Sequence, residues 1–89
     1  MRFHISGSLR RFVSFREQIQ YEEPSSVGEA LQRLVSEHPS LKPVLFDGQG
    51  NVRNVHRLFI NSVQIDHGEL VRPLGKDDRV DIVTAIAGG

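Results

Sequence analysis

Gly88 and Gly89, the last two residues of the sequence, are the residues whose type and position most clearly offer chemistry. Glycine has no Cβ, so two in succession can enter a channel that is too narrow for side chains. The four residues after Ala85 can extend roughly 13 Å from a folded domain. They would present the Gly89 carboxylate as a reacting group, which needs an activating enzyme because a carboxylate is a poor electrophile. The alternative is that these glycines have no function and that their residue type is unconstrained, as is common at chain ends.

Other side chains offer little for catalysis. The 89 residues contain no cysteine, which excludes disulfides, cysteine-ligated zinc, iron–sulfur clusters and thiol nucleophiles. No Gly-x-Ser-x-Gly segment occurs, and Asp77-Asp78 lies in an expected turn, where aspartate commonly binds backbone amides. The histidines match no short metal-ligand spacing, and they are His4, His38, His56 and His67. We therefore expect no bound metal or cofactor, and few ways for the side chains of this protein to do chemistry.

The charge of the chain is balanced, with 11 lysines and arginines against 11 aspartates and glutamates. This balance argues against non-specific binding to nucleic acid or to an anionic membrane. No apolar run is long enough to span a bilayer and no signal-peptide pattern opens the chain, so we expect a cytoplasmic protein. Arginine outnumbers lysine nine to two, which suits pairing with an acidic partner, although plain surface solvation is the alternative. The residues considered for such pairing are Arg53, Arg57, Arg72 and Arg79.

One strong helix is predicted over residues 27–37. Ser26 and Glu29 fit a capping box, in which Ser26 accepts from the Glu29 amide and Glu29 reaches back to the Ser26 amide. Apolar residues then recur at the spacing of one helical face, and they are Val27, Ala30, Leu31, Leu34 and Val35. The helix is expected to end at His38, because a residue before proline disfavours the helical conformation.

Alternating patterns predict the strands that must accompany this helix. The expected strands cover residues 2–6, 15–21, 57–61, 63–65 and 79–84. Glu17 would fall on the buried face of the second strand, which places that strand near an edge of the sheet. Residues 41–45 are expected to form a single packed turn, residues 47–51 a loop, and residues 74–78 a tight turn.

These elements predict an α+β fold of two layers. One helix cannot bury its apolar face alone, so it is expected to lie across one face of a mixed sheet of four to five strands. The first and last strands are the best candidates for the centre of the sheet. Their parallel pairing would make the β-grasp (ubiquitin-like) arrangement. We expect one domain over residues 1–85 and a flexible C-terminal tail over residues 86–89.

The order of elements and the tail resemble the ThiS/MoaD family of ubiquitin-like sulfur carriers. The resemblance covers nearly the whole chain in layout, and its specific motifs are Phe59-Ile60-Asn61 before a turn, the segment 74–83, and the ending 85–89. Among the family, the ending is most similar to that of carriers used for cysteine or thioquinolobactin-like synthesis. Two positions depart from the family pattern: Asp77 stands where glycine is usual, and Thr84 where proline is common. Aspartate can enter the left-handed region at some strain, so the turn is expected to survive.

The resemblance implies a mechanism in which the chain is a carrier and co-substrate, not an enzyme. An E1-like enzyme would use ATP and magnesium to adenylate the Gly89 carboxylate, and sulfur from a donor protein would then displace AMP. The resulting thiocarboxylate would donate its sulfur to a metabolite on a downstream enzyme. ATP would bind to the partner, because this chain has no phosphate-binding loop. Some relatives carry a short extension that a JAMM-type metalloprotease removes, so a trimming protease is a further possible partner.

The resemblance also implies a docking patch on the exposed face of the sheet. Phe59 alternates with Leu58 and Ile60, and Val83 alternates with Ile82. We expect Phe59 and Val83 to form this patch with Arg57 at its rim, unless Phe59 is simply part of the core. Ile86 and Ala87 are expected to contact the partner together with the glycines that follow them.

Three other functions stay open at this point. A protein modifier would use the same activation chemistry to join Gly89 to lysines of its targets. A small subunit of molybdopterin synthase would keep its tail inserted in a catalytic partner. A β-grasp binding module would carry its terminal glycines by accident, although the lack of cysteine excludes the plant-type ferredoxins.

Overall fold

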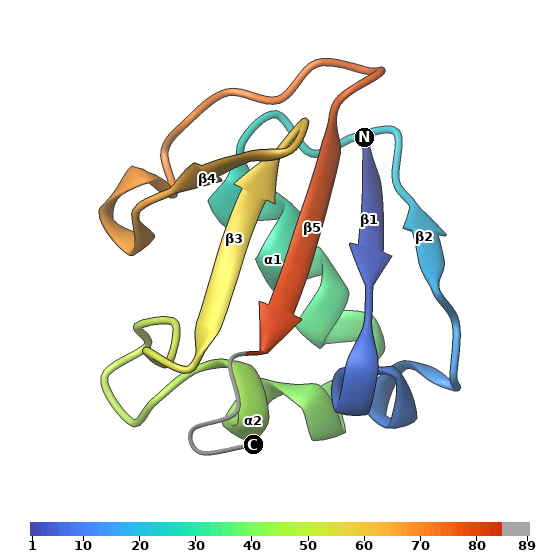
Figure 1. Ribbon diagram of the computed structural model, residues 1–89, viewed down its shortest axis with the longest axis vertical. Coiled ribbons are helices and arrows are strands. Elements are labelled where there is room, and N and C mark those ends of the chain that lie inside the picture. Colours follow the sequence, from blue (N-terminus) through green and yellow to red (C-terminus); the bar gives the residue numbers. More distant parts are fainter. Residues whose placement is uncertain (85–89) are drawn as a thin grey trace.

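The computed structural model describes residues 1–84, which form a mixed sheet with helices packed on one of its faces (Figure 1). The five strands are β1 (Arg2–Ile5), β2 (Gln18–Gln20), β3 (His56–Ile60), β4 (Val63–Ile65) and β5 (Arg79–Thr84). The α-helices are α1 (Val27–Glu37) and α2 (Lys42–Leu45), and the 3₁₀ helices are η1 (Gly7–Val13), η2 (Pro39–Leu41) and η3 (His67–Glu69). The predicted α+β class is confirmed. No helix within residues 1–84 is long and apolar enough to cross a membrane.

The centre of the sheet is a parallel pair made by the two strands farthest apart in sequence. The strand order is β2-β1-β5-β3-β4. In the register of this pair, Phe3 lies opposite Val80 and Ile5 lies opposite Ile82. β3 pairs antiparallel with the other side of β5, so β5 has a hydrogen-bonded neighbour on both sides. The predicted central position of the first and last strands is therefore confirmed, and with it the β-grasp topology.

The helix α1 begins at the predicted cap and buries the predicted face. Ser26 Oγ accepts from the Glu29 amide at 3.2 Å. The second half of the capping box is wrong by one residue, because the Glu29 carboxylate accepts from the backbone amide of Ser25 (3.1 Å) and from its hydroxyl, not from the Ser26 amide. These bonds from Ser25 lower the pKa of the Glu29 carboxyl below its ordinary value.

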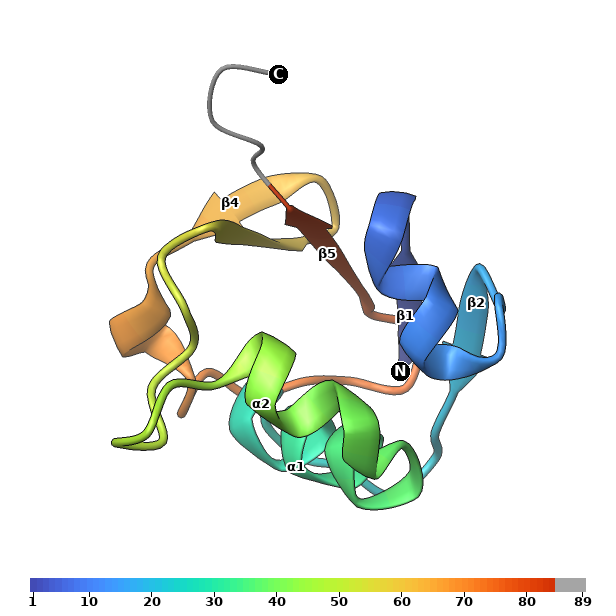
Figure 2. The ribbon, with the colours of Figure 1, turned by 90° about the horizontal axis from the view of Figure 1, so that it is seen from below.

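The core lies between the sheet and its helical layer, as the end-on view shows (Figure 2). Phe3, Leu58 and Ile82 point into it from the sheet and are fully buried. The expected packed turn at residues 41–45 is confirmed as η2 followed by α2, with Leu41 and Leu45 buried. The core thus lies on the face of the sheet that α1 and α2 cover (Figure 2). Neither of these helices covers the opposite face, which we call the open face.

The expected strand over residues 15–21 is wrong before residue 18. Residues 7–13 form η1, and Ser14 ends it in the left-handed conformation (φ 57°) with its amide bonded to the Arg10 carbonyl. Phe15 is also left-handed (φ 61°) and is 73% exposed, so it does not reach the buried face. Glu17 pairs with Arg10 at 2.9 Å instead of facing the core. The expected position of this strand at an edge is confirmed, since β2 is the first strand in the order of the described sheet and pairs with β1.

Candidate functional site

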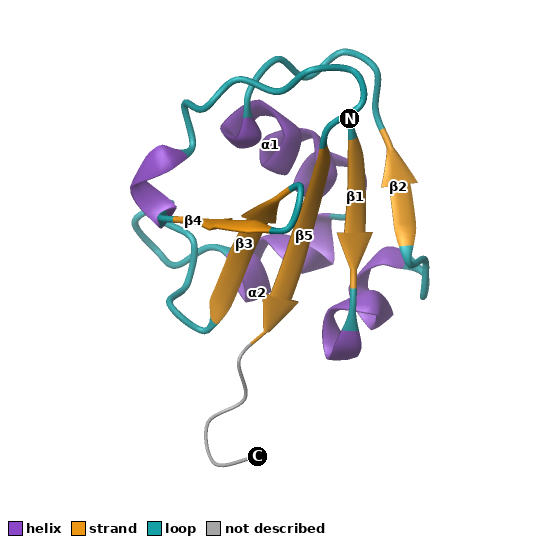
Figure 3. Ribbon diagram, turned by 45° about the horizontal axis from the view of Figure 1, so that its top comes forward, coloured by secondary structure: helices purple, strands orange, loops and turns teal. Residues whose placement is uncertain are grey.

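The candidate site is the end of β5, from which the chain continues toward its terminal glycines. β5 lies between β1 and β3 and ends at Thr84, the last described residue (Figure 3). Four of the residues expected to act, Ile86, Ala87, Gly88 and Gly89, lie outside the described residues, as does the boundary expected after residue 85. The described structure therefore defines the point, Thr84, after which these residues follow in the sequence. The pairing of β5 with β1 and β3 fixes the position and direction of the strand at that point.

A buried histidine ties the end of β5 to the helical layer. His56, at the start of β3, lies opposite Thr84 in the register, and its side chain is only 2% exposed. Its Nδ1 lies 3.1 Å from Thr84 Oγ1, and its Nε2 lies 2.9 Å from the carbonyl oxygen of Val44 in α2. A carbonyl only accepts, so Nε2 carries a proton, and in the neutral ring Nδ1 accepts from the Thr84 hydroxyl. His56 thus links α2, β3 and β5 at one point.

The open face of the sheet brings together the three residues predicted for docking. Arg57 lies directly opposite Val83, and Phe59 lies opposite Asp81, so all four share this face. Val83 is 39% exposed, whereas Phe59 is half-buried and lies outside the buried core. One Arg57 nitrogen donates to the Asn54 carbonyl just before β3. The patch of Phe59, Val83 and Arg57 is therefore a small apolar surface with an arginine beside it, next to the end of β5.

The turn before β5 is held by a carboxylate. Asp78 Oδ2 accepts from the Gly75 amide at 2.7 Å, and Asp78 Oδ1 accepts from Asn61 Nδ2 at 2.9 Å. The bond from the Gly75 amide has the larger effect and the bond from Asn61 the smaller, and both hold the pKa of the Asp78 carboxyl below its usual range. Asn61 in turn accepts from the Arg79 amide at 2.9 Å, so the β3–β4 turn is fixed to the first residue of β5.

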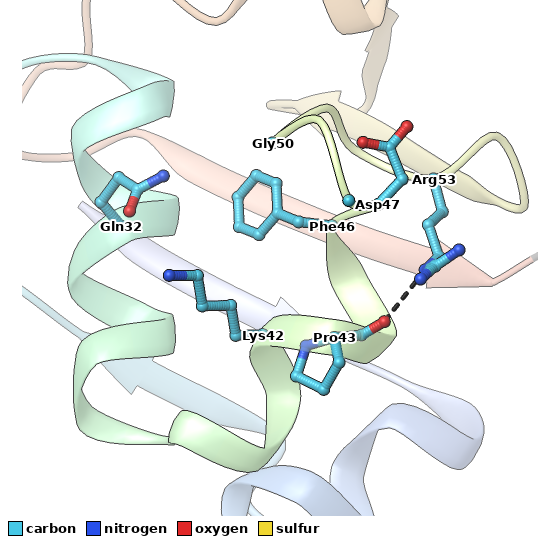
Figure 4. Close-up of a pocket in the computed structure, with 8 residues that line it drawn as sticks. Gln32, Lys42, Pro43, Phe46, Asp47, Gly50 and Arg53 are labelled. Carbon is cyan, nitrogen blue, oxygen red and sulfur yellow. Dashed lines mark hydrogen bonds between the residues drawn. The ribbon is translucent and has the colours of Figure 1, made fainter.

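Residues 1–84 form a groove but no cluster of metal-ligating side chains. No group of three or more histidine, aspartate or glutamate side chains within residues 1–84 is placed to hold a metal ion. A groove of about 540 Å³ lies beside α1, α2 and the loop that follows (Figure 4), with Lys42, Asp47 and Arg53 among its lining residues. Its carboxylate, Asp47, already accepts from the amides of Gln49 (2.9 Å) and Asn51 (3.0 Å). This carboxylate is therefore engaged in holding the loop that follows α2.

The family profile described as the ThiS family matches residues 3–89 of this chain, nearly its whole length. The chain belongs to the ThiS family. The match runs through the terminal glycines as well as the described domain. No curated protein sequence matches the chain significantly.

Solved structures share the fold of this ThiS-family chain at low sequence identity. A chain of the Amycolatopsis orientalis BexX/CysO complex is 20% identical, with a TM-score of 0.83 and coverage of 99% of this chain and 98% of that one. Small archaeal modifier protein 1 from Methanosarcina acetivorans is 22% identical, with a TM-score of 0.81 and coverage of 99% and 94%. Urm1 from Trypanosoma brucei is 18% identical, with a TM-score of 0.79 and coverage of 99% and 93%. These likenesses confirm the ubiquitin-like β-grasp fold.

The departure of this ThiS-family chain at Asp77 is accommodated without the strain that the sequence predicts. The turn forms, but the non-glycine residues with left-handed backbone within residues 1–84 are Ser14, Phe15, Asn61 and Ser62. Asp77 is not one of them, so the neighbouring Asp78 carboxylate closes the turn without a left-handed Asp77. A glycine is therefore not needed at position 77.

The role of His56 was missed by sequence reasoning, which placed the strand one residue too late. The alternation that puts Leu58 and Ile60 in the core also puts His56 there, once the strand begins at residue 56. A single histidine on a core face gives no metal-ligand spacing and therefore no signal for a special role. Its two hydrogen bonds depend on Val44 and Thr84, which are distant in sequence.

Proposed function

We propose that this ThiS-family chain is a sulfur carrier whose reactive group is the Gly89 carboxylate. The observation that supports this most strongly is the family match through residue 89, which joins the terminal glycines to the β-grasp domain in one unit. The central β5 carries the chain from the core toward these glycines. The domain is then the part that a partner enzyme recognises, and the last residues are the substrate of that enzyme.

In the proposed reaction, an E1-like enzyme binds ATP and magnesium. An oxygen of the Gly89 carboxylate attacks the α-phosphorus of ATP, pyrophosphate leaves, and an acyl-adenylate forms. Hydrosulfide, which a thiol reductant releases from the persulfide of a donor protein as the two thiol sulfurs join in a disulfide, then attacks the acyl carbon, AMP leaves, and a proton is released. The product is a Gly89 thiocarboxylate, a sulfur nucleophile for an activated metabolite on a downstream enzyme. The carrier contributes positioning, because the docked domain holds its terminus near the reacting phosphate.

The docking surface proposed for the E1-like enzyme is the patch of Phe59, Val83 and Arg57. Interfaces of this kind place an apolar centre inside a polar rim. Phe59 and Val83 supply the apolar part, and Arg57 supplies a donor for a carboxylate. Ile86 and Ala87 follow β5 in the sequence and precede Gly88 and Gly89, and we propose that they contact the same partner. A JAMM-type protease would act only on a longer precursor.

Phe59→Ala is expected to raise the KM for adenylation about 30-fold, the effect of losing an interface hot spot of about 2 kcal/mol. The half-buried position of Phe59 outside the core predicts a smaller effect on stability than a core truncation. Pyrophosphate exchange at varied carrier concentration measures the KM, and Val63→Ala on β4 is a matched control, because Val63 is an exposed apolar residue. A large fall in melting temperature with an unchanged KM would contradict the docking role.

A protein modifier is the second candidate, because the chain has the fold of small archaeal modifier protein 1. Intact mass spectrometry separates the two functions after incubation with the E1-like enzyme, ATP and a sulfur donor. A carrier is expected to gain about 16 Da when sulfur replaces oxygen at Gly89. A modifier instead appears in covalent conjugates with lysines of other proteins. A small subunit of molybdopterin synthase would be isolated in a stable complex with its catalytic partner.

A further inference from the structure

Phe15 is an exposed aromatic residue in the turn that ends η1, where its amide donates to the Arg10 carbonyl at 2.7 Å. Its backbone is left-handed (φ 61°), directly after the left-handed Ser14 (φ 57°). Non-glycine residues adopt this conformation at a steric cost, and such residues cluster at functional sites. The side chain is 73% exposed, so it returns little burial for that cost. The turn thus displays an aromatic ring to the solvent.

This turn lies at the end of the molecule where β5 finishes. β1 runs parallel to β5 and leads into η1, and the Ile5 amide bonds to the Glu17 carbonyl just before β2. The Arg53–His56 turn leads into β3 at the same end, where His56 lies opposite Thr84. Figures 1 and 3 show η1 and the start of β3 on either side of the end of β5. Phe15, which follows η1, and the exposed Val55, which precedes β3, therefore belong to segments at the same end of the sheet as Thr84.

The same two segments carry a concentration of arginine. Residues 6–17 and 51–57 contain five arginines and one acidic residue, Glu17. Glu17 pairs with Arg10, and Asp47 adds a second carboxylate close to Arg53 at this end, but four arginines form no ion pair within residues 1–84. They are Arg11, Arg16, Arg53 and Arg57, and all four are exposed. We call the five arginines together with Phe15 and Val55 the basic end.

The opposite end of the sheet has the opposite charge. Residues 22–29 and 69–78 contain six acidic residues against Arg72 and Lys76. These segments lie together, since the Val27 amide bonds to the Arg72 carbonyl and the Leu74 amide bonds to the Ser25 carbonyl. The zero net charge of the chain therefore hides a separation of charge along the strands. An acidic partner surface is attracted to the basic end and repelled from the other end.

We propose that the basic end docks against an acidic surface of the E1-like enzyme, with the Phe15 ring seated in an apolar socket inside that surface. The identity of the partner rests on the proposed function, whereas the acidic and apolar character of its surface rests on the charges and exposure of the basic end. The contact surrounds the end of β5 and orients the domain so that the chain beyond Thr84 faces the active site. It shares Arg57 with the open-face patch and adds residues at the end of the sheet where β5 finishes.

Phe15→Gly tests the aromatic anchor without harming the fold, because glycine adopts the left-handed conformation freely. We expect a melting temperature within about 3 °C of the parent. We also expect a rise of about 10-fold in the KM for adenylation by the cognate E1-like enzyme. Val71→Gly is the matched control, since Val71 is 88% exposed in the acidic half, and its KM is expected to stay unchanged. An unchanged KM for Phe15→Gly overturns the role of Phe15.

The charged part is tested by its dependence on salt. The double variant Arg11→Gln, Arg16→Gln is expected to slow association with the enzyme about 10-fold at 20 mM salt, with the difference vanishing near 0.5 M. The charge-matched control, Arg2→Gln with Lys76→Gln, removes two positive charges near the other end, where the Arg2 amide bonds to the Asp78 carbonyl. Equal slowing by both double variants would mean that only net charge matters, which overturns the basic end as a docking site.

A partner-free measurement keeps this proposal separate from the proposed function. A peptide of alternating aspartate and leucine is titrated into the ¹⁵N-labelled chain as the probe. Amide shifts are expected to concentrate in residues 10–17 and 53–57, to weaken in Phe15→Gly and to vanish in 0.5 M salt. Shifts that are as large in residues 22–29 and 69–78 would overturn the basic end. A chain that is not adenylated but shows the expected shifts would overturn the sulfur-carrier function alone.

Discussion

Deletion of Gly89 is expected to abolish adenylation of this chain, with a loss of at least about 10²-fold in kcat/KM. The deletion leaves a carboxylate on Gly88, but it withdraws the reacting group by about 3.5 Å. A misplacement of 1 Å at a reacting atom can already cost about 10²-fold in rate. Pyrophosphate exchange catalysed by the E1-like enzyme measures the loss.

The same deletion is not expected to change the stability of the domain. All buried residues of the described core lie between Met1 and Ile82, so the melting temperature should match that of the parent. Gly88→Ala is a second variant that keeps the chain length and adds only one Cβ, and its activation is expected to fall about 10-fold or more if the channel fits glycine alone. Activation of the Gly89-deleted chain at the parental rate would contradict the role of the terminal carboxylate.

His56→Leu is expected to lower the free energy of unfolding by about 3 kcal/mol. The substitution leaves the Val44 carbonyl and the Thr84 hydroxyl without their partner, and each unsatisfied buried polar group costs about 1–3 kcal/mol. For a domain of this size, about 3 kcal/mol corresponds to a fall of roughly 12–24 °C in melting temperature. Thermal unfolding followed by circular dichroism measures it.

Thr84→Val separates the two hydrogen bonds of His56. It removes the hydroxyl at the end of β5 and keeps the bond to Val44, so its cost is expected to be about 1 kcal/mol, smaller than that of His56→Leu. A melting temperature of His56→Leu within about 3 °C of the parent would show that the buried histidine does not hold the end of β5 in place.

The sequence was sufficient for the elements whose signals are local. The cap at Ser26 and the apolar face of α1 are encoded within twelve residues, and the alternation in β3 and β5 is encoded within six or fewer. The two-layer packing followed from the need to bury one face of the helix against a sheet, and the first and last strands were the best candidates for the centre of that sheet. The terminal glycines were read directly, because their meaning depends on residue type and position and not on tertiary contacts.

The rest could not be predicted, because it depends on contacts between distant segments. Alternating apolar residues made Phe15 look like the first buried residue of a strand, but the left-handed Ser14 and Phe15 turn the chain and expose the ring. His56 gains its role from Val44 and Thr84, which the fold brings to it. The separation of charge between the two ends is likewise invisible in a composition with zero net charge.

Intact mass spectrometry of the native chain tests the central claim most directly. The purified chain is incubated with its E1-like enzyme, ATP, magnesium and a sulfur donor, and the Gly89-deleted chain is treated in parallel. Replacement of one terminal oxygen by sulfur is expected to add about 16 Da to the native chain and nothing to the deleted chain. An unchanged mass of the native chain in a reaction that releases AMP, or the same gain in the deleted chain, would contradict sulfur carriage at Gly89.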